Sequence, residues 1–381
     1  MAALAGHLGF SARPLPLDES LAHSLGIPWA GSPPLLMLGE GARRALLMAA
    51  PPREPLRPFV AKIAQRLATQ SPHQLWFLMV ARAGGGEGAI AAWHADGARV
   101  RVSALLFDSA RVLESDIETL LALQAAAGGQ DTLSHARWCE IMGRDALSHR
   151  FYRALERAIL ALGEGARGSA PSEARRELAL LTASRLLFLS FLQARGWLDG
   201  DADFLVRHFD AALVKGGDTH RRFLEPLFFG TLNTPVSRRA AAARMFGRVP
   251  FLNGGLFARS AVEARYRTVR FRDDEVGALF DDVLTRYRFT AREEQREWSE
   301  AAIDPEMLGR AFESLMASRE RRDSGAYHTP QDLVARVSDA ALERDVLGHR
   351  TIPRSVPLGR VGGCSHRKLV PLLLWKTRYD L

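Results

Sequence analysis

Three strand-like segments follow one another between residues 74 and 107, and they require a β-sheet in the front part of this chain. The first is the apolar run Gln74–Arg82, the second is Ala89–His94, and the third, Arg99–Phe107, alternates polar and apolar residues. The glycine-rich turn Gly84–Gly88 separates the first two, and Asp96-Gly97 before the third is a good hairpin signal. Because such tight turns join antiparallel neighbours, the sequence predicts a small antiparallel sheet.

Helical periodicity dominates the rest of the chain. Residues 1–70 alternate Pro-rich stretches with one predicted helix, Phe59–Thr69. After the strands, the spacing of apolar residues predicts helices over Ser115–Ala126, Ala136–Met142, His149–Leu162, Ser172–Arg195, Asp201–Val214 and Glu275–Tyr287. Aromatic and glycine-rich stretches at Pro226–Pro235 and Val249–Phe257 indicate loops or short turns, and the glycines of Gly163–Pro171 indicate a linker. We therefore predict an α+β protein that is mostly helical.

These patterns divide the chain into four parts. Residues 1–162 are predicted to form a mixed α/β N-terminal domain, and residues 172–300 a helical middle domain. Residues 301–348 start a further domain with new helices. Residues 349–381 are a basic tail with neither helical nor strand periodicity.

The net charge of +8 is not independent evidence for DNA binding, because most of it lies in the tail. From residue 350 to residue 381 there are seven Lys and Arg and one acid, which leaves a net charge of +2 for the first 349 residues. Two of the four lysines, Lys368 and Lys376, also lie there. The tail is either a disordered basic extension or an out-of-frame segment that begins where the reading frame departs, near Gly348.

The cysteines and the apolar runs indicate in which cellular compartment the protein is found. Cys139 and Cys364 form no C-x-x-C pair, which argues against a zinc site and suits a reducing cytoplasm. No basic-then-apolar signal begins the chain, and the late apolar run Leu372–Trp375 is too short to cross a bilayer. We expect a cytoplasmic protein with no metal site and no membrane segment.

Two helix starts lie close together near the end of the third part. Asp304 can cap a helix whose first residue is Pro305. Thr329 repeats the arrangement, with Pro330 in the first turn and Asp332 three residues after the cap. The short loop 324–328 therefore leads into a helix N-terminus, where free N–H groups and a partial positive charge suit a carboxylate or a phosphate.

The loop and the second helix start, Gly325-Ala-Tyr-His-Thr-Pro, resemble the G-x-[FY]-[FY]-T-P segment of N6-adenine DNA methyltransferases from bacterial type II restriction–modification systems, including the fused type IIG enzymes. Three upstream blocks resemble the same family and occur in the same order: Ser184–Leu198, Val249–Phe257 and Pro305–Leu315. The resemblance covers roughly residues 180–345 and implies that residues 301–348 are the first helices of an incomplete Rossmann-like methyltransferase domain.

The resemblance also implies the ligands. It implies S-adenosylmethionine as the cofactor and double-stranded DNA as the substrate, with another restriction–modification subunit as a further partner. The residues that match the family's segment at the methionine end of the cofactor are Gly325, Tyr327, Thr329 and Pro330. His328 stands where the family more often has a second aromatic residue.

The motifs that would perform the methylation do not occur in these 381 residues. The family's D-P-x-x-G-S-G and [DNS]-P-P-[YFW] motifs are absent, and the nearest match, Ser32-Pro-Pro-Leu, ends in leucine. We therefore assign no catalytic residue, leave open whether the chain is itself an enzyme, and expect it to be inactive alone. We also expect the apolar faces of residues 304–316 and 333–342 to be exposed or mobile.

Two alternatives remain. The chain can be a non-catalytic DNA- or partner-binding module that works with a separate catalytic chain. It can also contain a defective nuclease domain, since neither Lys62 nor Lys215 has the acid two residues earlier that a Glu-x-Lys nuclease site needs. We interpret Ser184–Leu198 as a core helix and Asn253–Phe257 as a turn with an apolar anchor.

Overall fold

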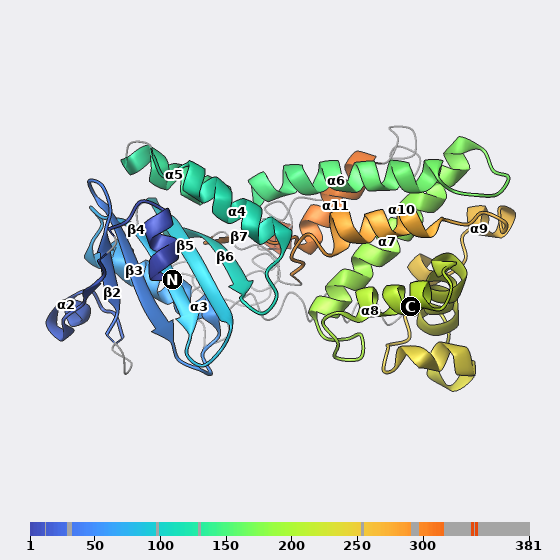
Figure 1. The fold of residues 1–381 in the computed structure, drawn as a ribbon, viewed down its shortest axis with the longest axis horizontal. Helices are drawn as coiled ribbons and strands as arrows, with labels where there is room; N and C mark the ends of the chain where they lie inside the picture. The colour runs from blue at the N-terminus through green and yellow to red at the C-terminus, as the bar shows by residue number, and fades with distance from the viewer. Residues whose placement is uncertain are drawn as a thin grey trace, which may run out of the picture. The chain divides into compact units, whose positions relative to one another are not determined.

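The structure is a computed structural model that describes residues 1–11, 13–28, 33–96, 99–128, 131–252, 255–290, 297–315, 337, 338, 340 and 341. Met1–Leu315 form one compact unit (Figure 1). The second unit is Met316–Leu381, and nearly all of it lies outside the described residues. The predicted tail and most of the predicted Rossmann-like domain therefore lie there as well.

One mixed sheet occupies the front part of the chain, and its strands are ordered in space as in the sequence. They are β1 (Leu15–Pro16), β2 (Leu35–Leu38), β3 (Arg43–Ala50), β4 (Leu75–Arg82), β5 (Glu87–Asp96), β6 (Arg99–Asp108) and β7 (Trp298–Glu300). The strands β4, β5 and β6 confirm the three predicted ones, and they pair antiparallel. The prediction of a small antiparallel sheet is wrong, because within the described residues the sheet has seven strands and the pairs β3–β4 and β6–β7 are parallel.

The parallel pairs explain why the sequence did not indicate the full sheet. Parallel neighbours need a crossover connection and leave no tight turn between them. Helix α3 (Leu56–Gln70) makes the crossover from β3 to β4, and β7 comes from the stretch predicted as helical middle domain. A turn motif in the sequence indicates antiparallel neighbours, and no such motif marks a parallel pair, so these pairings were not predicted.

Both faces of the sheet are covered, which accounts for its unbroken apolar strands. In β3, Leu46 and Met48 face the core that contains α3. Ala45 and Leu47 face the opposite core, which includes side chains from α1 (Ala2–His7), α4 (Glu114–Ala125) and α5 (Asp131–Ile141). Side chains alternate along a strand, so a strand buried on both faces has no polar side to present.

A third, larger core holds the helical part together. Its helices and helical turns are α6 (Arg144–Glu164), α7 (Ser172–Ala194), α8 (Phe204–Val214), η1 (His220–Leu224), η2 (Pro226–Leu232), α10 (Asp273–Leu279) and η6 (Phe280–Leu284). Around them lie η3 (Val236–Arg238), η4 (Ala241–Phe246), η5 (Gly255–Phe257) and α9 (Ala261–Arg265), and α2 (Glu19–Ser24) lies in the front part. The predicted helices at α6, α7, α8 and α10 are confirmed.

The predicted loop at Pro226–Pro235 is wrong for its first seven residues, which form the π-helical turn η2. Its apolar side chains Leu227, Phe228 and Leu232 are buried in the helical core. Burial of these residues favours a helical backbone over the loop that the aromatic and glycine content indicated.

The glycine-rich connection between α6 and α7 is held in place by backbone pairing. Arg167 N–H donates to the Arg270 carbonyl at 2.8 Å, and Arg270 N–H donates back at 2.9 Å. Gly168, with φ +107°, lies so close to Thr268 that an added Cβ would stand 2.6 Å from its carbonyl oxygen. A glycine is therefore required at this position.

Helix α7 is the centre of the helical core. Among the described residues it is the one helix long and apolar enough to cross a membrane, but 61% of its apolar window is buried inside the protein. Phe191 is buried and Phe188 packs against the core, which confirms the interpretation of this block as a core helix.

Candidate functional site

Helix α11 (Pro305–Leu315) leads toward the segment that resembles a cofactor site, and its start is as predicted. The Met307 N–H donates to Asp304 Oδ1 at 2.8 Å, which makes Asp304 the cap of a helix that begins at Pro305. This hydrogen bond satisfies one of the backbone donors that every helix leaves free at its N-terminus.

A buried ion-pair network fixes this helix start to the rest of the unit. Arg144 Nη1 lies 3.0 Å from Asp304 Oδ2 and 2.8 Å from Glu306 Oε2. The other oxygen of Glu306 pairs with Arg310 at 2.7 Å. The backbone N–H of Arg144 donates to Ser299 Oγ in β7 at 3.1 Å. Asp304 is 3% exposed and Glu306 6%, so the network joins α6, β7 and α11 away from water.

The first turn of α11 corrects one expectation. Met307 is fully buried and Leu308 packs against the helical core, so this turn is not exposed as predicted. Its apolar side chains pack on α6 and α7, which the sequence did not identify as their partners. In the other predicted apolar face, within residues 333–342, Val337 and Ala341 are exposed, in agreement with the expectation. The remaining side chains of both faces lie outside the described residues.

The predicted cofactor residues cannot be placed against this helix. Gly325, Tyr327, Thr329 and Pro330 all lie outside the described residues, and so does His328. Their assignment to S-adenosylmethionine stays a prediction. What the structure contributes is the anchored helix that precedes them in the chain.

Arg185 joins two of the sequence blocks that resemble the methyltransferase family. It belongs to α7, within Ser184–Leu198, and its Nε donates to the Leu256 carbonyl at 2.7 Å. Its Nη2 donates to the Ala258 carbonyl at 3.0 Å, immediately after the block Val249–Phe257. The two blocks, far apart in the sequence, are therefore in direct contact.

Glu263 completes the surroundings of Arg185. The guanidinium makes a bidentate pair with it, at 2.5 Å and 3.0 Å, and is itself only 1% exposed. Burial alone would raise the pKa of Glu263, but hydrogen bonds from Arg185 and Ser260 lower it below its ordinary value. The carboxylate is charged, and it also caps α9 by accepting from the Ser260 N–H at 2.8 Å.

The turn that Arg185 holds has the predicted apolar anchor. Phe257 is 1% exposed, and its ring lies 6.0 Å from that of Phe188 and 5.9 Å from that of Phe228. The interpretation of this block as a turn with an apolar anchor is confirmed for residues 255–257. Sequence reasoning missed Arg185, although a single charged residue within the apolar run Leu178–Leu192 of a predicted core helix is itself a signal.

A strongly basic stretch, residues 236–272, lies on the surface of the helical part. It contains nine arginines and one acid, Glu263, which is a net charge of +8. The charge count over the first 349 residues concealed this stretch, because acids elsewhere compensate it. We call residues 236–272 the basic segment.

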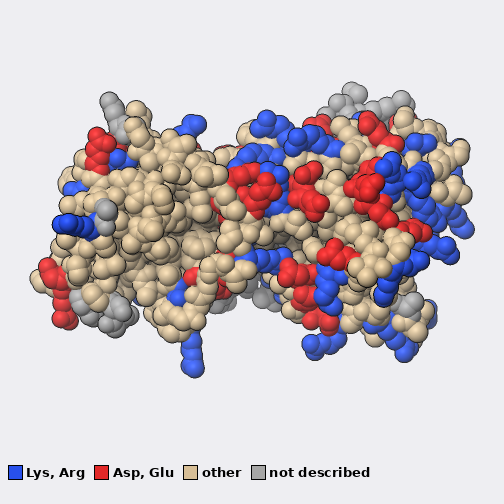
Figure 2. All heavy atoms as spheres, viewed as in Figure 1, with Lys and Arg blue, Asp and Glu red and all other residues tan. Residues whose placement is uncertain are grey.

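Most arginines of the basic segment are exposed. Exposed members are Arg238, Arg244, Arg248, Arg259, Arg265, Arg267 and Arg272. No carboxylate of the described residues forms a salt bridge with Arg238, Arg244, Arg265 or Arg267. Figure 2 shows Lys and Arg gathered at the end of the helical part where α9 and the α6–α7 connection lie. Such a surface attracts anions.

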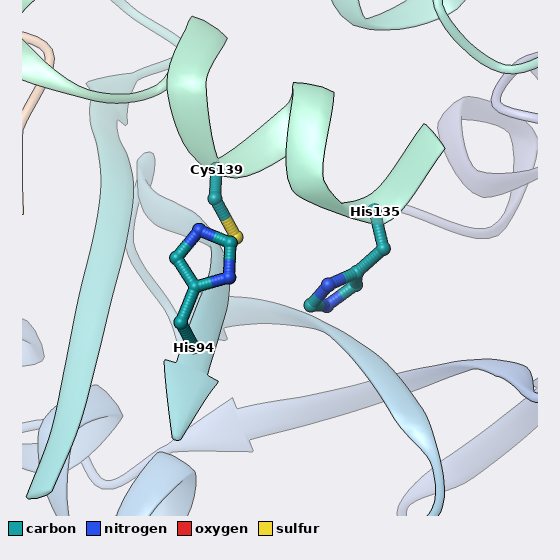
Figure 3. A group of neighbouring side chains, drawn as sticks. All are labelled: His94, His135 and Cys139. Atoms are coloured by element: carbon teal, nitrogen blue, oxygen red, sulfur yellow. The ribbon is translucent and has the colours of Figure 1, made fainter. Parts of the chain in front are cut away.

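Three potential metal ligands meet between α5 and β5 (Figure 3). The ligand atoms of His94, His135 and Cys139 all lie within 4.8 Å of one another. Within the described ranges, this is the one group of at least three His, Cys, Asp or Glu residues that could hold a metal ion. Burial lowers the pKa of His94 below its ordinary value and that of His135 to about 4, and it raises the pKa of the Cys139 thiol to about 12. Both imidazoles are therefore neutral near pH 7 and the thiol is protonated.

The expectation of no metal site considered only the spacing of the two cysteines. The sequence held part of the signal for this group, since Cys139 lies in the predicted helix Ala136–Met142 and His135 directly precedes that helix. The structure starts α5 at Asp131, so the two residues, four apart, lie on one face. The contribution of His94 from β5 was not visible in the sequence.

Comparison with known proteins relates the chain to a restriction–modification protein over part of its length. No family model and no solved structure matches the chain. A protein of Methanocaldococcus jannaschii that carries the name of a type II restriction enzyme and methyltransferase is 27% identical over 186 residues. The match covers 44% of this chain and 15% of that protein, so the chain corresponds to a small part of its relative.

Proposed function

We propose that this chain is the front part of an S-adenosylmethionine-dependent DNA adenine-N6 methyltransferase of a restriction–modification system, and that it acts in the cytoplasm. The observation that carries the proposal is the order of features near residues 304–330. A helix start anchored by Arg144 is followed by Gly325-Ala-Tyr-His-Thr-Pro, in a chain related to a restriction–modification protein.

In this proposal the residues Gly325, Tyr327, Thr329 and Pro330 contact the methionine end of the cofactor. Thr329 begins a predicted helix, whose free N–H groups and positive end suit the cofactor's carboxylate. The bound cofactor supplies the methyl group. The Arg144 network fixes the start of α11, the helix that precedes these residues in the chain.

Methyl transfer itself needs residues that this sequence does not contain. Adenine must be flipped out of the duplex into a pocket that stacks on the base and binds its amino group. Neither D-P-x-x-G-S-G nor [DNS]-P-P-[YFW] occurs in the 381 residues. We expect the purified chain, incubated with duplex DNA and S-adenosylmethionine carrying a labelled methyl group, to transfer no label.

The first test is to sequence the gene and the downstream DNA from the codon for Ala341 onward and to read all three frames. If another frame encodes D-P-x-x-G-S-G and then N-P-P-Y, the chain is the front part of an interrupted methyltransferase, as proposed. If the frame of the tail is confirmed and no such motif follows, the methyltransferase proposal fails.

The basic segment favours a second candidate function, a module that binds DNA for a separate catalytic chain. Lys and Arg that neutralise phosphates displace counterions, so the affinity for DNA falls steeply with salt. The exposed arginines that pair with no carboxylate in the described part of the chain, Arg265 and Arg267 among them, are suited to such contacts. Both candidate functions predict duplex DNA as the partner.

Fluorescence anisotropy with a labelled duplex tests this contact. The double variant Arg265→Ala, Arg267→Ala should weaken binding and lower the slope of log K against log salt by about 2, since each phosphate contact contributes about 0.9. The matched control is Arg153→Ala, Arg157→Ala, which removes two exposed arginines of α6. Equal affinity and salt slope in both variants and the unchanged chain would exclude the basic segment as a DNA-contacting surface.

A further inference from the structure

The group of His94, His135 and Cys139 lies where a helix crosses the sheet. His135 and Cys139 are on one face of α5, and His94 is on β5 opposite them. In Figure 3 the two α5 side chains and the His94 ring point into the same space between helix and strand. The rings of His94 and His135 are 6.3 Å apart at their centroids and nearly perpendicular, at 84°.

Packing holds α5 against the sheet at this place. Trp138 is fully buried, and its ring lies 4.9 Å from that of Phe77 in β4. Its Nε1–H donates to the Leu123 carbonyl at 2.9 Å. His135, one turn before Trp138 in the helix, and Cys139, the residue after it, are therefore held in one position by the core and not by the group itself.

One hydrogen bond assigns the donor atom of His135. Its Nε2 lies 3.0 Å from the Trp76 carbonyl oxygen. A carbonyl can only accept, so Nε2 carries the proton and Nδ1 keeps its lone pair. Histidines that bind metals commonly donate their other ring N–H to a carbonyl or a carboxylate, which fixes the ring and makes the ligand more basic.

Two imidazoles and one thiol are a ligand set for zinc. Zn²⁺ binds Cys sulfur at about 2.3 Å and His nitrogen at about 2.0–2.1 Å, in tetrahedral geometry. These lengths place neighbouring ligand atoms roughly 3.4–3.6 Å apart. One ligand atom of each of the three residues now lies within 4.8 Å of the others, so the side chains have to approach by about 1 Å. His94 is exposed and can make this movement, whereas the two α5 ligands are buried.

We propose that His94, His135 Nδ1 and the Cys139 thiolate bind one Zn²⁺ ion, with a water molecule as the fourth ligand. The exposure of His94 gives solvent access to that fourth position. The ion ties α5 to β5, and binding releases the thiol proton to solvent. This site lies within the N-terminal sheet and does not depend on the proposed methyltransferase function.

Zinc titration of the reduced, chelator-treated full chain tests the proposal. We expect one Zn²⁺ per chain by elemental analysis and competition with a chromophoric chelator. Co²⁺ in place of Zn²⁺ should give a thiolate-to-metal charge-transfer band in the near ultraviolet. Zinc should also raise the thermal unfolding midpoint, because an ion that binds only the folded chain stabilises it.

Two single-ligand variants and two controls decide the outcome. His94→Ala, at an exposed residue that the fold does not need, should weaken zinc binding by at least about tenfold and abolish the rise in midpoint. Cys139→Ala should also remove the Co²⁺ charge-transfer band. The controls His149→Ala, at an exposed residue of α6, and Cys364→Ala should bind like the unchanged chain.

Three results would overturn the proposal. The first is less than one zinc per chain. The second is zinc binding that His94→Ala leaves unchanged, a result that holds even if Cys139→Ala fails to fold. The third is loss of the charge-transfer band in Cys364→Ala, because the thiolate ligand would then be the other cysteine.

Discussion

Arg144 is the residue whose burial most affects the helix that leads to the predicted cofactor segment. It is 8% exposed and it neutralises two carboxylates that are buried with it, Asp304 and Glu306. A buried charge left without its partner costs far more than an exposed one, because water cannot solvate it. The anchoring of α11 therefore depends on an arginine 160 residues before Asp304 in the sequence.

We expect Arg144→Ala to lower the free energy of unfolding by about 3–5 kcal/mol, since it removes the arginine that pairs with the buried carboxylates of Asp304 and Glu306, although Glu306 keeps its pair with Arg310. Urea titration monitored by circular dichroism measures the loss. The matched control is Arg137→Ala, which breaks a pair with Glu140 whose side chains are 68% and 67% exposed. That change should cost at most about 1 kcal/mol. Equal losses in both variants would show that the network does not anchor the helix.

His220 gives the protein a defined acid sensitivity. Burial lowers its pKa from 6.5 to about 4 in the folded chain, and its ring packs 5.4 Å from that of Phe271. Glu225, Asp218 and Glu263 act to raise this pKa and Arg270 to lower it, and burial outweighs them. Below pH 6.5 the unfolded chain binds a proton that the folded chain does not, so stability falls between pH 6.5 and pH 4.

The loss from His220 alone reaches roughly 3 kcal/mol when protonation is complete. His220→Phe keeps the aromatic ring and removes the titration, so its stability should fall less over this pH range than that of the unchanged chain. Thermal unfolding midpoints at pH 7.5, 5.5 and 4.5 measure the difference. The same substitution at the exposed His149 should leave the pH profile unaltered, and identical profiles for all three proteins would contradict the assignment.

At the scale of elements, α7 and the turn before α9 behave as one piece because of Arg185. Its guanidinium makes four hydrogen bonds to the turn and to α9, and cation–π contacts with Phe228 and Phe229 place it between η2 and that turn. A planar guanidinium can serve a bidentate carboxylate and two carbonyls together, and an ammonium group cannot.

We therefore expect Arg185→Lys to destabilise the chain by roughly 3 kcal/mol or more, although the charge is kept. Hydrogen exchange should show the loss first in residues 255–265, where the turn and α9 lie. Arg153→Lys, the same change at an exposed position of α6, is the control and should be neutral. Unchanged protection of residues 255–265 in Arg185→Lys would mean that other contacts hold the turn.

At the scale of the whole molecule, the described cores lie within Met1–Leu315. We expect a chain that stops after Leu315 to keep the helical and strand signal of residues 1–315 in circular dichroism and to unfold in urea with a midpoint within about 0.3 M of the full chain, since the described cores that set the transition are retained. Aggregation or loss of helical signal in the shorter chain would show that residues after 315 belong to the same folding unit.

The predicted cofactor residues and the candidate zinc ligands differ in how far the sequence could identify them. Gly325, Tyr327 and Thr329 form a short linear motif, so a resemblance to a family can single them out without any structure. His94 meets His135 and Cys139 only because β5 and α5 pack together. A group assembled from separate elements has no linear pattern beyond the i, i+4 pair within α5.

The sequence by itself determined what depends on neighbours along the chain. It determined the three strands with tight turns, the core helix α7 and the capped start of α11, because turn residues, helical periodicity and caps act over a few residues. Only the tertiary structure decided the parallel strand pairs, the contact of Arg144 with Asp304 and Glu306, and the contact of Arg185 with the later block. These contacts join residues far apart in the sequence. They form because a charge or a strand edge that folding buries needs a partner, and that partner comes near only in the folded chain.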